Sequence, residues 1–203
     1  MGLYKPDYRD SVDIAKYWQS KGVLVGLARG AFRVLNPGHP DFLWRAKNLC
    51  GKLFVNLNND IWVTRYKGKT PLNETERAEV VSKLEMVDYV FVHPGQDIHP
   101  AVSLALLCRP NIIFVREPEP GEIDRLPEER EVYANNHYFP TIKVLPRSKQ
   151  SSSSSQVIRE IEEGAIERAK AGQDEAAQRE HKIGKLDTLI ITPDGLKKNS
   201  SSK

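Results

Sequence analysis

Five short apolar runs recur along the chain, and each is followed by a stretch in which apolar residues return every three or four positions. The runs are residues 22–28, 52–57, 87–92, 111–115 and 141–146. Short continuous runs rich in Val, Ile and Leu are typical of parallel strands that are buried on both faces. The pattern therefore predicts five parallel strands that alternate with helices.

The segments between the runs have the spacing of amphipathic helices. After the first run, four apolar residues return at helical spacing: Phe42, Leu43, Ala46 and Leu49. Further helices are expected over residues 11–20, 73–86, 99–108, 126–136 and 156–170. Strands that alternate with helices build βαβ units. We therefore predict an α/β fold: a Rossmann-like, doubly wound parallel five-stranded sheet with helices on both faces.

The same pattern suggests three parts: an N-terminal helical extension (1–20), one compact domain (21–170) and a polar C-terminal tail (171–203). The composition becomes charged and polar after about residue 171. Within the tail, LDTLIITP is compatible with one more strand or hairpin arm, and the final LKKNSSSK is expected to be disordered.

Composition removes several classes of protein from consideration. The net charge of the 203 residues is only +3 and forms no basic block, which argues against a nucleic-acid partner. Apolar runs stay well below the ~18 residues of a membrane span, and the first residues do not resemble a signal peptide. Cys50 and Cys108 lie far apart in apolar contexts, as reduced buried thiols do. We expect a cytoplasmic protein without a membrane partner.

The loop RGAFRVLNPGH, residues 29–39, is the first candidate site. In such folds ligands bind past the carboxyl ends of the strands, and this loop follows the first predicted strand. Gly30 would let a phosphate approach the backbone closely. His39 would stand at a helix N-terminus, where free N–H groups and the helix dipole favour anions, and could donate to a phosphate oxygen. The alternative is that His39 only caps the helix.

Two other stretches also allow more than one interpretation. Five serines, residues 151–155, lie between the last predicted strand and a strongly periodic helix. Serine at a helix start binds anions well, although serine runs are also flexible linkers. His93 and His99 flank Asp97 in a loop that has no cysteine and no second carboxylate. We therefore predict no metal-ligating set of residues there.

Taken together, residues 22 to about 166 resemble the cytidylyltransferase-like nucleotidyltransferase family, in its glycerol-3-phosphate cytidylyltransferase and sugar-phosphate nucleotidyltransferase branch. That family has Gly-x-Phe-Asp-x-x-His-x-Gly-His after strand one and Lys-Gly after strand two. It also has an arginine on the next helix and Ile-Ser-Ser or Ile-Ser-Thr-Thr at the start of the last helix. The matching blocks here are GAFRVLNPGH, YKGK, NETER and SSSSS.

The resemblance assigns roles to individual residues. It implies four catalytic residues: His39, Asn36, Lys67 and Arg77. It implies eight nucleotide-binding residues: Gly30, Ala31, Phe32, Gly38, Arg147, Ser153, Ser154 and Ser155. The ligands that it implies are a nucleoside triphosphate with Mg²⁺ and a small phosphorylated substrate; a homodimer is left open.

Three departures from the family pattern leave the activity open. Arg33 stands where aspartate is usual, and Asn36 stands where the first histidine is usual, although its amide can still donate a hydrogen bond. Residues 115–121, VREPEPG, replace a segment that helps to recognise the nucleotide. We expect a nucleotidyltransferase that couples CTP or ATP to a sugar or polyol phosphate and releases pyrophosphate. The alternative is a non-catalytic nucleotide-binding or regulatory protein on the same scaffold.

Overall fold

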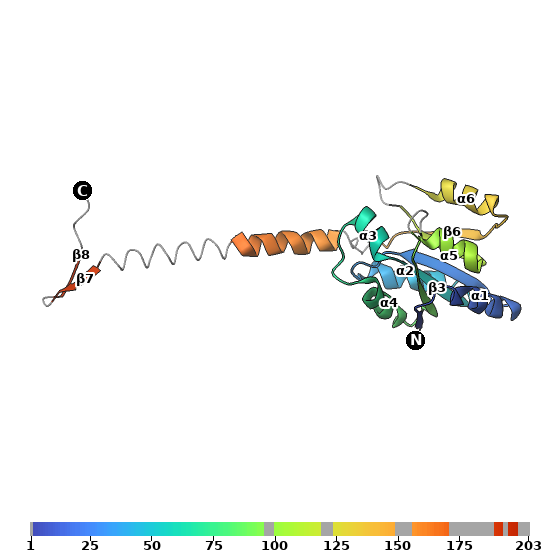
Figure 1. Ribbon diagram of the computed structural model, residues 1–203, viewed down its shortest axis with the longest axis horizontal. Coiled ribbons are helices and arrows are strands. Elements are labelled where there is room, and N and C mark those ends of the chain that lie inside the picture. The colour runs from blue at the N-terminus through green and yellow to red at the C-terminus, as the bar shows by residue number, and fades with distance from the viewer. Residues whose placement is uncertain are drawn as a thin grey trace. The chain divides into compact units, whose positions relative to one another are not determined.

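Six parallel strands form one sheet in the computed structural model, with strand order β1-β4-β3-β2-β5-β6 (Figure 1). The structure describes residues 2–95, 100–118, 124–148, 156–170, 189–192 and 195–198. The strands are β1 Leu3–Lys5, β2 Val25–Gly30, β3 Lys52–Asn58, β4 Tyr89–His93, β5 Ile112–Arg116 and β6 Thr141–Leu145. The order reverses at β2, so its carboxyl end is the switch point at which such folds bind ligands.

The predicted α/β class is confirmed, and all five predicted strands lie in the sheet. The sheet has six strands rather than five, because β1 pairs in parallel with the edge of β4, with Leu3 opposite Tyr89. A strand of three residues is too short to show an apolar pattern. The predicted N-terminal extension therefore contributes to the sheet, while the predicted domain limits remain predictions.

Helices cover both faces of the sheet. They are α1 Asp10–Ser20, α2 Gly38–Lys47, α3 Asp60–Lys67, α4 Glu74–Ser82, α5 Pro100–Cys108 and α6 Leu126–Asn135. A further helix, described by itself, spans residues 156–170. Of the helices in the described residues, α3 is the one that was not predicted. It begins where Asn59 accepts a hydrogen bond from the backbone N–H of Trp62 at 2.8 Å, and it buries only Trp62 and Val63. Two buried residues are too few to produce a helical pattern.

Successive side chains of β3 point to opposite faces of the sheet, and each face has its own apolar core. Leu53, Val55 and Leu57 face α2 and α4, and together they form the first core. Phe54 faces the second core, to which α1, α5 and α6 contribute Ala15, Leu104 and Tyr133, among others. We call these the α2 face and the α6 face of the sheet. Both faces meet at one carboxyl edge, and the candidate site lies there.

Contacts divide the chain into residues 1–157 and residues 158–203. In the second unit, β7 Leu189–Thr192 and β8 Gly195–Lys198 form an antiparallel hairpin, which agrees with the hairpin arm considered for LDTLIITP. The final LKKNSSSK was expected to be disordered, yet its first three residues belong to β8. Among the described residues, no helix is long and apolar enough to span a bilayer.

Candidate active site

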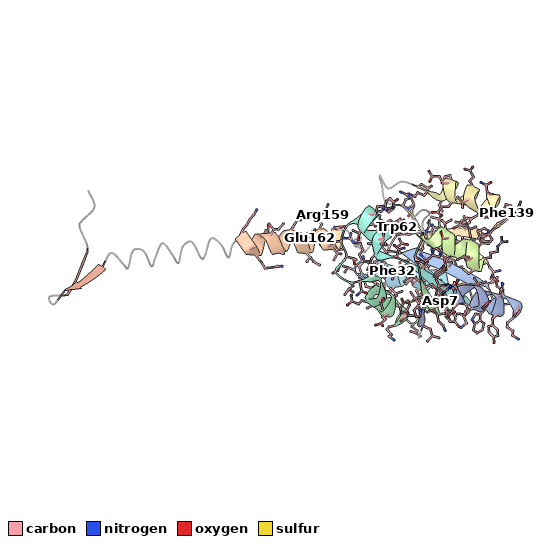
Figure 2. All side chains as sticks on the ribbon, viewed as in Figure 1. Asp7, Phe32, Trp62, Phe139, Arg159 and Glu162 are labelled. Atoms are coloured by element: carbon pink, nitrogen blue, oxygen red, sulfur yellow. The ribbon has the colours of Figure 1, made fainter. Side chains whose placement is uncertain are left out.

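The loop after β2 turns sharply at Phe32, which has a φ of 47°. Its ring is buried; Phe32 is among the residues labelled in Figure 2. A Cβ built on Gly30 would lie 2.7 Å from that ring. Gly30 is therefore needed to make room for the Phe32 ring. The sequence had offered a different reason, namely the close approach of a phosphate.

The N-terminus of α2 is capped by Asn36, whose Oδ1 accepts a hydrogen bond from the backbone N–H of Gly38 at 3.0 Å. The backbone N–H of Asn36 in turn donates to Nδ1 of His39 at 3.1 Å. Both side chains therefore satisfy backbone N–H groups at the start of α2, so His39 shares in the capping. A further role of His39 toward a phosphate remains a prediction.

His39 is neutral at physiological pH. Burial and the positive charge of Arg116 lower its pKa to about 4. Because Nδ1 accepts a hydrogen bond, the single proton of the neutral ring sits on Nε2. The ring is steadied by Phe32, whose centroid lies 5.0 Å away. His39 therefore presents a fixed N–H donor at the N-terminus of a helix, as an anion requires.

Arg77 is only 1% exposed and acts within the protein. Its Nη1 donates to the carbonyl of Ala31, and its Nη2 donates to the carbonyl of Asn58 at 3.0 Å. The same Nη2 forms an ion pair with Asp60 at 2.6 Å. The structure thus gives Arg77 a positioning role, since it ties the loop after β2 to the end of β3. A direct catalytic role for it remains a prediction.

Arg33 connects the loop after β2 to a different segment, the one that follows α3. Its Nη2 donates to the carbonyl of Lys69 in the YKGK segment. Lys67 ends α3 with an exposed side chain, and Gly68 follows with a φ of 77°. Arg33, which departs from the family pattern, therefore fastens the lysine segment to the loop that carries Phe32.

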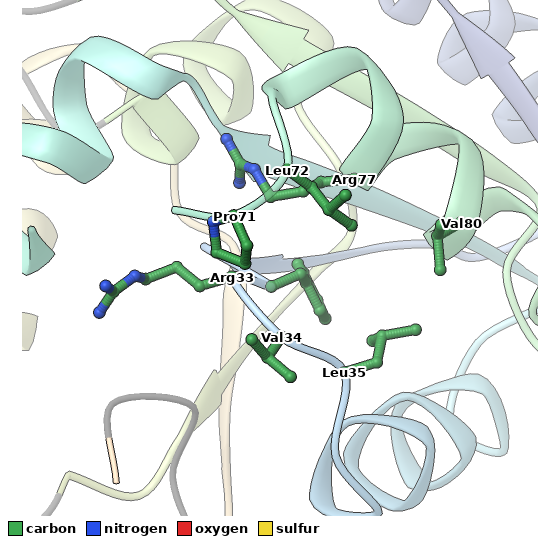
Figure 3. Close-up of a pocket in the computed structure, with 8 residues that line it drawn as sticks. Arg33, Val34, Leu35, Pro71, Leu72, Arg77 and Val80 are labelled. Carbon is green, nitrogen blue, oxygen red and sulfur yellow. The ribbon is translucent and has the colours of Figure 1, made fainter. Parts of the chain in front are cut away.

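A cavity of about 230 Å³ lies between the loop after β2 and residues 71–80. Its lining is mostly apolar and consists of Phe32, Arg33, Val34, Leu35, Pro71, Leu72, Arg77 and Val80. Figure 3 shows the guanidinium group of Arg33 pointing away from Leu35 and Val80. Apolar walls do not suit phosphate groups, so we do not place the triphosphate in this cavity.

Two arginines lie near the carboxyl end of β5. Arg147 follows β6, and its backbone N–H donates to Oε2 of Glu117 at 3.3 Å. Arg116 ends β5 and is close enough to His39 to lower its pKa. Sequence reasoning missed Arg116, although its position directly after the apolar run NIIFV was a usable signal. Ser153, Ser154 and Ser155 lie outside the described residues.

The α6 face carries a polar group that the sequence analysis also missed. Arg29 on β2 forms an ion pair with Glu129 on α6 at 2.7 Å. Asn56 on β3 lies directly opposite Arg29, and Asn58 follows on the same face. We call these four residues the α6-face cluster. Its signal in the sequence was FVNLN, in which two amides alternate within an apolar strand.

A model of the cytidylyltransferase-like family matches residues 27–161, which is more than half of the chain. The chain belongs to the cytidylyltransferase-like family. It is thus a member of a nucleotidyltransferase family, as the resemblance predicted. The match covers the loop with Asn36 and His39, the YKGK segment and the α6-face cluster.

Bifunctional proteins named HldE are among the curated relatives of this cytidylyltransferase-like chain. The protein from Paramagnetospirillum magneticum is 43% identical over 89 residues, which is 43% of this chain and 18% of that protein. The protein from Wolinella succinogenes is 46% identical over 87 residues, 41% of this chain and 18% of that one. The matched region thus spans about a fifth of these relatives.

Solved structures agree with the cytidylyltransferase-like fold. A lipopolysaccharide core biosynthesis protein from Thermoplasma volcanium is 25% identical, with a TM-score of 0.53. That match covers 64% of this chain and 100% of the other. Pantoate-beta-alanine ligase from Francisella tularensis, solved with beta-gamma ATP and beta-alanine, is 15% identical with a TM-score of 0.57, over 78% of this chain and 73% of the other. The second likeness shows the fold alone.

Proposed function

We propose that this protein transfers a nucleotidyl group from a nucleoside triphosphate to the phosphate of a sugar or polyol phosphate. The observation that carries the proposal is the neutral His39, held as an Nε2–H donor at the N-terminus of α2. A donor fixed in advance stabilises charge that develops on a transferring phosphate without reorganising during the reaction.

In the proposed reaction, an oxygen of the acceptor phosphate attacks the α-phosphorus of the nucleoside triphosphate. A new P–O bond forms on one side, and the bond between the α-phosphorus and its bridge to the β-phosphate breaks on the other. Pyrophosphate leaves with the electron pair of that bond. The attacking phosphate is already an anion, so no general base is needed, and positioning and charge stabilisation provide the catalysis.

Some of these residues are proposed to bind the phosphates, and others hold the loops that carry them. His39, the backbone N–H groups of α2 and the side-chain amide of Asn36 are proposed to face the phosphates. Lys67 and Arg147, with Ser153, Ser154 and Ser155, are proposed to hold the rest of the triphosphate, as the resemblance implies. Arg33 and Arg77 hold the loops that carry these groups, by the contacts described above.

The acceptor is proposed to be a sugar phosphate or a polyol phosphate. Support comes from the relatives, one of which is a lipopolysaccharide core biosynthesis protein that is 25% identical. For the donor we propose ATP or CTP; a neighbour solved with beta-gamma ATP is too distant to decide between them. The proposed location is the cytoplasm, which is consistent with the free thiols of Cys50 and Cys108.

Mg²⁺ is proposed to accompany the triphosphate. Among the described residues, no group of three or more His, Cys, Asp and Glu side chains is placed to hold a metal ion. Of the nearby carboxylates, Asp60 is already engaged by Arg77 and by the backbone N–H of Glu74. The described residues therefore do not by themselves form a Mg²⁺ site.

The test is a screen for pyrophosphate release. The full chain is incubated with Mg²⁺ and ATP or CTP, together with glycerol 3-phosphate or a panel of sugar 1-phosphates. Pyrophosphate release that requires one donor and one acceptor would support the proposal, and it should fall sharply in His39→Ala. Tight nucleotide binding without pyrophosphate from any pair would instead favour the non-catalytic alternative.

A further inference from the structure

We propose that the α6-face cluster is the part of the active site that recognises the hydroxyl groups of the acceptor, with Asn56 as its central residue. The inference rests on the proposed function, since it concerns the second substrate of that reaction. It assigns the two faces of the sheet to different parts of the chemistry. Phosphates would bind on the α2 face, and the hydroxylated portion of the acceptor would bind on the α6 face.

The first observation is unused hydrogen-bonding capacity. Asn56 is 0% exposed, yet neither its Oδ1 nor its Nδ2 has a hydrogen-bond partner among the residues that the structure describes. The same holds for Oδ1 of Asn58 and for Oε2 of Glu129, whose residues are 3% and 6% exposed. A buried polar atom without a partner is costly, and such atoms in a fold require an explanation.

The second observation is their position. Asn56 and Asn58 lie at the carboxyl end of β3, beside the switch point of the sheet. The pairing of β2 with β3 places Asn56 opposite Arg29, whose Nη1 binds Oε1 of Glu129 at 2.7 Å. The free Oε2 of Glu129 therefore lies on the Arg29 side of Asn56. Four of the eight buried side-chain atoms without a hydrogen-bond partner among the described residues thus belong to the α6-face cluster.

One more donor extends this row. His93 on β4 lies opposite Asn58, and its Nδ1 accepts from the backbone N–H of Gly95 at 2.9 Å. Burial lowers the pKa of His93, which favours the neutral ring. Because Nδ1 accepts a hydrogen bond, the proton of that ring lies on Nε2. Tyr8 packs against the ring with a centroid distance of 4.5 Å.

The chemistry of the cluster matches hydroxyl groups better than a phosphate or a base. Its one cation, Arg29, is already paired with Glu129, and the free carboxylate oxygen would repel an anion. Asn56 offers both a donor and an acceptor, whereas Asn58 and Glu129 offer acceptors. A hydroxyl both donates and accepts, so several neighbouring hydroxyls can satisfy this mixture.

The test is Asn56→Leu, because leucine has the branching of asparagine but no polar atom. We expect KM for the acceptor to rise about 10- to 100-fold, since buried hydrogen bonds to the substrate are lost. KM for the nucleoside triphosphate should change less than about twofold, because Asn56 is not proposed to contact the nucleotide. The melting temperature of the free protein should stay level or rise, because an unsatisfied polar group is removed. Asn56→Ala serves as a second variant if leucine is too bulky to be accommodated.

Asn111→Leu is the matched control. Asn111 precedes β5 at the opposite edge of the sheet, and its Oδ1 accepts from the backbone N–H of Val25 at 2.9 Å. The same substitution there should lower the melting temperature and leave both KM values unchanged. A hydroxyl-recognising role and a structural role therefore predict opposite patterns for the two asparagines.

A binding measurement separates this inference from the proposed function. The shift in melting temperature caused by a hexose 1-phosphate, glycerol 3-phosphate or inorganic phosphate is measured on wild type and on Asn56→Leu. A shift with the hydroxylated probes that is lost in the variant, while the shift with inorganic phosphate remains, supports the inference even without turnover. Equal shifts in both proteins, no shift in wild type, or an unchanged acceptor KM overturns it. In those cases the partner of Asn56 is an internal water.

Discussion

The amino and carboxyl edges of the same sheet are built in opposite ways. At the amino edge, Asp88 accepts hydrogen bonds from Lys47 at 2.5 Å, Lys52 at 2.9 Å and the backbone N–H of Leu53 at 2.8 Å. At the carboxyl edge, Asn56 has no partner for either of its side-chain polar atoms among the described residues. One edge satisfies its polar groups, and the other leaves them available.

The difference shows where the fold is stabilised and where it is prepared for chemistry. Satisfied charge networks at the amino edge stabilise the folded state without touching a substrate. Buried groups without partners weaken a fold, and proteins tolerate them chiefly where a function requires them. We therefore expect substitutions at the carboxyl edge to affect rate and those at the amino edge to affect stability.

The largest expected effect lies at the carboxyl edge. His39→Ala should lower kcat by about 10²–10³, as the loss of one donor to a transferring group typically does. The melting temperature should fall only modestly, because the hydrogen bond from the backbone N–H of Asn36 to His39 is lost while Asn36 still binds the backbone of Gly38. Steady-state kinetics and thermal melts on the same two proteins check this. A large loss of stability with an unchanged rate would reverse the assignment of the two edges.

Arg77 connects the site to the core, so it should affect stability. Arg77→Lys cannot keep contacts with Ala31, Asn58 and Asp60 together, and unfolding should become about 3 kcal/mol easier. The matched control is Arg45→Lys, whose ion pair with Asp41 is partly exposed and should cost less than about 1 kcal/mol. Urea unfolding measures both, and equal losses would contradict the positioning role.

Asp88→Asn tests the amino edge directly. The variant keeps the shape of the side chain but loses the charge that binds Lys47 and Lys52. We expect a loss of about 2 kcal/mol in unfolding free energy and an unchanged kcat/KM. A fall in kcat/KM beyond twofold, measured at a temperature where the variant is folded, would show that the two edges are coupled.

A smaller effect should appear in the dependence of stability on pH. The folded-state pKa of His39, about 4, lies below its ordinary value of 6.5. Between these two values the unfolded chain binds a proton that the folded protein does not, so stability falls as pH drops through this window. Thermal melts from pH 7 to pH 4 should therefore show a smaller decline in His39→Gln than in wild type. Parallel declines would contradict a buried neutral His39.

The smallest effect is expected from the C-terminal end. Truncation after Lys170 should leave nucleotide affinity unchanged within about twofold, because the residues proposed to bind the nucleotide all precede it. Isothermal titration with ATP and CTP on both chains checks this. Lost affinity would mean that residues after 170 complete the site.

The fold could be predicted from the sequence because it depends on short apolar runs that alternate with helical patterns, and each predicted run overlaps a strand of the sheet. The pattern could not reveal β1, which is three residues long, or α3, which buries only two side chains. Short elements are fixed by edge pairing and by a cap, and these act through individual hydrogen bonds that leave no periodic trace.

The candidate site was predictable only in part, for a related reason. A motif shows which residue types occur, so His39 and Lys67 could be named from the sequence. It does not show where the hydrogen bonds go. The sequence could not show that Arg77 has three partners inside the protein, or that Asn36 binds the backbone of Gly38. Their catalytic roles remain predictions.

The pairing of β1 with β4 also determines the order in which the sheet can assemble. Leu3, near the start of the chain, lies beside Tyr89, so the two must close a loop that contains β2, β3 and the helices between them. Closing a long loop is slow compared with pairing neighbouring segments. The β2–α2–β3 unit, which carries His39 and Asn56, can therefore fold before the edge strand docks. We therefore expect β1 to be among the last strands to pair.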